Sequence, residues 1–202
     1  MAPERVSKRF RRLYGRCGKE LARYADADAV ASERLNKILI IQERWPLLER
    51  ADLYEAAQAV AGLQGKLLGK QAAVLQASTE ELERALLELE DAVESLRQVS
   101  REGRSFVTAE YRSSSGRSRR PGGDEDGEDE DRTLTIAASD YVDGLYAIFK
   151  MHSRSARLKR AVYEEIKACK TDAERRELAR YFVSPPCMDQ ALVSGLLSRA
   201  RA

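Results

Sequence analysis

Leucines recur at every seventh position in the middle of the chain. Leu86 and Val93 fill the intermediate positions of the last two heptads. A seven-residue apolar repeat places one face of a helix against another helix, because each side chain can insert between four residues of a facing helix. The sequence therefore predicts a helical seam formed by Leu68, Leu75, Leu82, Leu86, Leu89, Val93 and Leu96. Its partner stays open: a second copy, another helix of this chain, or a different helical protein.

Composition agrees with helices throughout. Much of the chain consists of Ala, Leu, Glu, Arg, Gln and Lys, which lose little rotamer freedom in a helix. Aromatic residues are only 6%, which is thin for a thick core and favours long helices that pack on each other. We predict an all-α, elongated helical bundle or coiled coil in four parts. These are a basic segment (1–26), long helices with the seam (27–100), a disordered linker (101–136) and C-terminal helices (137–202).

The linker prediction rests on charge. Arginines and serines are frequent from 101 to 120, and the run from Asp124 to Asp131 is almost entirely acidic. Like charges repel one another and bury no apolar area, so such a segment is expected to be disordered.

Helices are expected to resume near Ser139. Thr171 and Glu174 form a capping-box pattern at the start of a short helix, and Asp189 is placed to cap a last one. Apolar spacing before them predicts a helix face that binds a partner: Tyr141, Leu145, Ile148, His152, Val162 and Ile166.

Catalysis is not expected. The single histidine, His152, has no nucleophile in a recognisable relation to it, so we interpret it as packed or hydrogen-bonded. The three cysteines form no C-x-x-C pair, and two glycine–lysine clusters lack phosphate-loop spacing. We predict no catalytic residue, no metal and no cofactor. No run of eighteen apolar residues exists, and no signal peptide is expected from 1–8, so we predict an intracellular protein.

The basic N-terminus has several interpretations. Arg11, Arg12, Leu13 and Tyr14 have the form of a cyclin-docking peptide. The same segment suits nucleic-acid phosphates, with Phe10 and Tyr14 available for stacking, or nuclear import. It also suits the solvated face of an amphipathic helix. The net charge of only +2 favours indirect or weak contact with nucleic acid.

Trp45 is the only tryptophan, and Pro46 follows it directly. Proline lacks a backbone donor, so we expect a helix kink or break at this point. The large indole ring beside the break is either a core anchor or an interface anchor.

Two stretches resemble a known family. The first is Trp45-x-x-Leu48-x-x-Ala51 after an aliphatic run. The second is Leu158-Lys159-Arg160-x-Val162-x-x-Glu165-Ile166, followed by Tyr181 and Pro185-Pro186. In this order, and over roughly 35–100 and 135–198, they resemble the cyclin-dependent kinase 2-interacting protein family.

The resemblance implies a non-enzymatic adaptor of the nucleus and cytoplasm. Such proteins pair with another small helical protein and attach to a type II AAA+ ATPase assembly. That assembly acts in late maturation of the large ribosomal subunit, and in DNA replication and genome maintenance. The resemblance also implies an association with a cyclin-dependent kinase. Lys159 and Arg160 are expected either to make charged contacts with the partner or to be solvated surface charges. The alternatives are a self-associating coiled-coil tether of a kinetochore or trafficking complex, and an RNA- or DNA-binding accessory protein.

Overall fold

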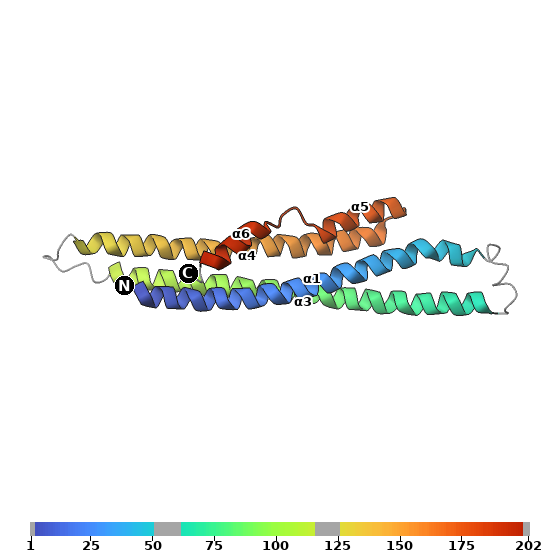
Figure 1. Cartoon of the computed structure of the whole chain (residues 1–202), viewed down its shortest axis with the longest axis horizontal. Coiled ribbons are helices and arrows are strands. Elements are labelled where there is room, and N and C mark those ends of the chain that lie inside the picture. The colour runs from blue at the N-terminus through green and yellow to red at the C-terminus, as the bar shows by residue number, and fades with distance from the viewer. Residues whose placement is uncertain (1–2, 51–61, 116–125, 200–202) are drawn as a thin grey trace. The chain divides into compact units, whose positions relative to one another are not determined.

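The fold is all-α, as predicted. The computed structural model describes residues 3–50, 62–115 and 126–199, without the side chains of 3–6, 113–115, 126–137 and 199. These residues contain helices and no strand (Figure 1). The helices are α1 (Pro3–Glu49), α3 (Leu63–Ser115), α4 (Asp126–Ala168), α5 (Asp172–Val183) and α6 (Gln190–Arg199).

The helices divide into two compact units. The first unit comprises Met1–Arg23, Asp91–Arg154 and Cys187–Ala202, and the second comprises Tyr24–Glu90 and Ser155–Pro186. Each unit therefore takes one part of α1, α3 and α4. Helix α6 belongs to the first unit and α5 to the second.

The first unit has an aromatic centre. Phe10 of α1 stacks on Tyr141 of α4, with ring centroids 5.1 Å apart, and meets Phe106 of α3 edge-on at 5.9 Å. Val193 adds α6 to the same core. The buried members of this core are Phe10, Leu13, Tyr14, Cys17, Leu96, Val99, Ala138, Val142, Leu145, Ile148 and Val193.

The second unit buries aliphatic side chains from the same three long helices. Leu35 on α1, Leu82 on α3 and Ile166 on α4 are each at most 2% exposed. Phe182 of α5 is fully buried, so the short helix is part of this unit's interior. Tyr24 donates a 2.9 Å hydrogen bond to Ser155, which joins α1 to α4 within the unit.

Local signals fixed the C-terminal helix starts as expected. The backbone N–H of Glu174 donates to Thr171 Oγ1, and the N–H of Thr171 donates to a Glu174 carboxylate oxygen, both at 3.3 Å. The N–H of Leu192 donates to Asp189 Oδ1 at 2.9 Å. Both predicted caps are confirmed, because each satisfies N–H groups that have no partner within the helix.

The predicted linker 101–136 is helical at both of its ends. Helix α3 continues to Ser115 and α4 begins at Asp126, while residues 116–125 lie outside the described residues. Gly103 is buried, and Phe106 packs on the first unit's core. These tertiary contacts outweigh the local arginine- and serine-rich composition, so the boundary at 101 is corrected.

Helix α1 continues through Pro46 and ends at Glu49, so a break at Pro46 is wrong, whereas a kink there stays a prediction. Proline removes one backbone donor, and here the helix ends within one turn of that loss. The indole Nε1 of Trp45 donates a 2.8 Å hydrogen bond to Glu49, which supports this last turn.

Candidate interaction surfaces

The leucine seam is largely interior. Among the seven predicted positions, Leu82, Leu86, Leu89 and Leu96 are at most 2% exposed, whereas Leu68, Leu75 and Val93 are half-buried. The chain's own helices cover the four buried leucines, so for them the intramolecular alternative holds. A second copy or another protein would have to displace those helices first.

The predicted partner face of α4 is interior too. Leu145, Ile148 and His152 are buried in the first unit, and Val162 and Ile166 in the second. Tyr141 is half-buried against Phe10. These six side chains therefore pack inside their own units, and their role in binding a partner stays a prediction.

His152 agrees with its interpretation as a packed histidine. It is 5% exposed, and its Nδ1 donates to the carbonyl oxygen of Ile148, 2.9 Å away on the same helix. The ring therefore has a structural role in α4.

Lys159 is buried and so is not placed to contact a partner, whereas the contact predicted for Arg160 stays a prediction. Lys159 is fully buried in the second unit, with Nζ 2.6 Å from Asp28 Oδ1 of α1 and 4.7 Å from the Phe182 ring centroid. Arg160 Nε donates to Glu90 at 3.0 Å. Burying the charge is tolerated because the lysine is paired.

Lys159 also caps the C-terminal end of helix α5. Its ammonium donates to the carbonyl oxygen of Phe182, in the last turn of α5, where carbonyl groups have no partner within the helix. Asp28 Oδ1 accepts no hydrogen bond of good geometry despite its closeness to Lys159, so that contact is an ion pair. One lysine thus connects α1, α4 and α5.

The cyclin-docking interpretation needs an accessible leucine. Leu13 and Tyr14 are only 2% and 5% exposed, inside the first unit's core. Phe10 is buried as well and offers no stacking surface for a base. Arg11 and Arg12 remain exposed. Among these residues, only the arginines keep the predicted role in contacting another molecule.

Tyr14 is fixed by its surroundings. Its hydroxyl donates a 2.9 Å hydrogen bond to the carbonyl oxygen of Tyr141, and it lies over Gly144 of α4. Burial raises the pKa of Tyr14 and raises the pKa of the neighbouring Cys17 to about 12. Both groups therefore stay protonated at neutral pH, Tyr14 as a donor and Cys17 as a packing residue.

Trp45 is half-buried in the second unit, so its side chain is neither fully buried in the core nor fully exposed to solvent. Its indole Nε1 donates a hydrogen bond to Glu49 on the same helix. Both predicted roles of the ring, core anchor and interface anchor, stay predictions.

A ridge of cations follows the outer side of α1 in the first unit. The basic ridge consists of Arg9, Arg12, Arg16, Lys19 and Arg23, all exposed. Their spacing of three and four residues keeps them on one helix face. The sequence analysis used only the total charge of this segment, although the spacing that places the cations on one helix face can be read from the sequence.

Large apolar side chains are also exposed along α1 in the second unit. The α1 stripe consists of Val30, Glu33, Lys37, Ile40, Arg44 and Leu47. Val30, Ile40 and Leu47 are 41%, 38% and 48% exposed. Ile40 belonged to a recognised aliphatic run, but the sequence alone did not separate its buried members from its exposed one.

The described part of the chain contains no group of three or more His, Cys, Asp or Glu residues suited to a metal ion. It contains no helix long and apolar enough to cross a membrane.

The sequence profile of the family described as "Ribosome biogenesis protein C1orf109-like" matches residues 4–195. The chain belongs to this family. The match includes α1, α3, α4 and α5 almost completely, and therefore both units. Comparison with curated proteins and with solved structures finds no match.

Membership in the C1orf109-like family agrees with the ribosome-maturation role that the resemblance implied. It does not confirm the cyclin-dependent kinase 2-interacting name. The family match shows that the chain is a ribosome biogenesis protein.

Proposed function

We propose that the chain is a non-enzymatic helical adaptor in ribosome biogenesis. It binds another small helical protein and attaches to a type II AAA+ ATPase assembly that acts on late precursors of the large ribosomal subunit. The family supports the ribosomal role. The adaptor role comes from the resemblance, and we propose a location in the nucleus and cytoplasm with it.

The α1 stripe carries the proposal. Ile40 and Leu47 are seven residues apart, and Val30 and Lys37 form a second row with the same interval. Rows with this spacing suit contact with a second helix, because they return to one face every two turns. The three exposed apolar side chains would supply the area buried against a partner helix. The charged side chains between them would fix the register of that helix.

Exposure favours partner binding through the α1 stripe over self-association through the leucine seam. The buried leucines already have partners within the chain, whereas Ile40 and Leu47 are exposed. Tyr181 and Val183 on α5 are exposed in the same unit, at 49% and 58%, and they add to the exposed apolar area of this unit. We therefore assign the partner site to the second unit.

The test is quantitative recovery of partners with tagged full-length protein. We expect the unaltered chain to recover a AAA+ ATPase and a small helical protein. Ile40→Glu/Leu47→Glu should recover at least tenfold less of the helical protein, because two carboxylates would be buried at the contact. Leu67→Glu/Leu87→Glu is the matched control, since both leucines are exposed on α3 of the same unit, at 40% and 55%.

The control should keep normal recovery, and circular dichroism should show unchanged helix content in both variants. Recovery of no AAA+ ATPase by the unaltered chain would sink the proposal. Equal losses in the two variants would remove the partner site from the α1 stripe.

A further inference from the structure

We propose that the basic ridge of α1 binds the phosphate backbone of double-stranded RNA. The ridge belongs to the first unit and the α1 stripe to the second, so this inference does not rest on the proposed partner site. It begins from a charge arrangement that the fold does not require.

The ridge works against the stability of its own helix. Arg9, Arg12, Arg16, Lys19 and Arg23 form four successive pairs at intervals of three or four residues. Like charges at these intervals destabilise a helix by about 0.2–0.5 kcal/mol per pair. Folding alone therefore gives no reason for this pattern.

Little acid neutralises the ridge. Arg16 pairs with Glu102 of α3 at 2.6 Å, which holds the pKa of that carboxyl below its ordinary value, and Arg23 pairs with Glu20 at 2.7 Å. Within the described part of the chain, Arg9, Arg12 and Lys19 form no ion pair. Arg101, exposed on α3 next to Glu102, adds a further cation in the same unit.

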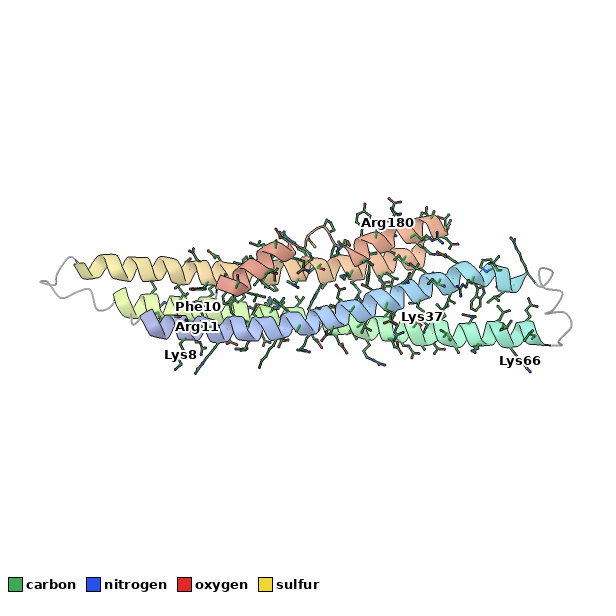
Figure 2. All side chains as sticks on the ribbon, in the orientation of Figure 1. Lys8, Phe10, Arg11, Lys37, Lys66 and Arg180 are labelled. Carbon is green, nitrogen blue, oxygen red and sulfur yellow. The ribbon has the colours of Figure 1, made fainter. Side chains whose placement is uncertain are left out.

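The chemistry of the ridge fits phosphates. Four of its five members are arginines, whose planar guanidinium groups can bind phosphate oxygens through two parallel hydrogen bonds. From Arg9 to Arg23 the helix rises by about 21 Å, so one line of charges can follow a nucleic-acid backbone. Figure 2 shows Lys8 on the outer side of α1 and Phe10 toward the neighbouring helices.

The buried aromatic rings decide between kinds of polyanion. Single-stranded RNA is usually held by stacking on exposed aromatic side chains, but Phe10 and Tyr14 are buried. Membrane binding by an amphipathic helix needs a free apolar face, and the apolar face of this part of α1 forms the core. Duplex RNA is recognised mainly through backbone and shape, which a ridge without aromatic rings can provide.

The experiment is fluorescence anisotropy of a labelled 20-base-pair RNA duplex with the full-length chain between 50 and 200 mM KCl. With about three to five phosphate contacts, log Kd should rise with log salt concentration with a slope of about 3–4. Arg9→Gln/Arg12→Gln/Lys19→Gln should weaken binding at least tenfold at 50 mM KCl and lower the slope by about 2–3. These three residues are chosen because none forms an ion pair with a described residue.

Lys66→Gln/Lys70→Gln/Arg180→Gln is the matched control. It removes the same charge from exposed positions of the second unit outside the α1 stripe, two of which (Lys66 and Arg180) are labelled in Figure 2, and it should leave the slope nearly unchanged. The ridge variant should melt no lower than the unaltered chain, because like-charge repulsion is relieved.

An unchanged slope in the ridge variant, or an equal loss in the control, would overturn the proposal. Equally tight binding of single-stranded RNA or of a DNA duplex would overturn the assignment to double-stranded RNA.

Discussion

Gly144→Ala should destabilise the first unit by about 2–4 kcal/mol. An added Cβ would lie 2.3 Å from the Tyr14 hydroxyl oxygen and 3.1 Å from Leu196 Cδ2. Tyr14 is buried and bonded to the carbonyl oxygen of Tyr141, so it cannot turn away without losing that bond. Thermal and urea unfolding followed by circular dichroism would measure the loss.

Two further variants identify the cause. Gly15→Ala is the control, because its added Cβ meets nothing within 4 Å, and it should stabilise the helix by about 0.5–1 kcal/mol. Adding Tyr14→Phe to Gly144→Ala should recover part of the loss, because the nearest remaining ring atom is 3.6 Å away. No recovery in this double variant would mean that the Tyr14 hydroxyl is not the obstacle.

Asp28→Asn should destabilise the second unit at the lower end of the range of about 3–5 kcal/mol typical for breaking a buried ion pair. The Lys159 ammonium would stay fully buried without its carboxylate partner. The effect is at the lower end because the Asp28 side chain is 30% exposed to water. Asp26→Asn is the control, an exposed carboxylate on the same helix.

A double-mutant cycle tests the pairing itself. Lys159→Met keeps most of the side-chain volume and leaves only Asp28 and one carbonyl oxygen to be hydrated, so it should cost less than Asp28→Asn. The combined variant should be more stable than Asp28→Asn alone, because the unpaired buried charge is gone. Strict additivity of the two losses would show that Asp28 and Lys159 do not interact.

Local patterns were the part of the fold that the sequence predicted best. The capping box of Thr171 and the cap of Asp189 depend on atoms within three residues of one another, and both formed as expected. Heptad spacing correctly predicted that Leu82 and Leu89 face other helices. Spacing cannot say whose helices these are, because every long amphipathic helix of this chain offers a compatible face.

Predictions from residue type were wrong where contacts between residues distant in the sequence determine burial and helix limits. Lysine is almost always exposed, so nothing local indicated that Lys159 would be buried between Asp28 and the end of α5. The composition around Gly103 indicated a linker, yet a close approach of Leu145 to this glycine fixes α3 there. Leu13 sits in a motif that resembles a docking peptide, but the core of the first unit buries it.

The chain's own helices cover four leucines of the seam, and we expect a partner to bind elsewhere. Light scattering on the purified full-length chain, combined with size-exclusion chromatography, tests this most directly. We expect a folded monomer of about 22.7 kDa at micromolar concentration. A stable dimer that Leu82→Glu/Leu89→Glu separates into folded monomers would contradict it, because the seam would then be an interface between copies.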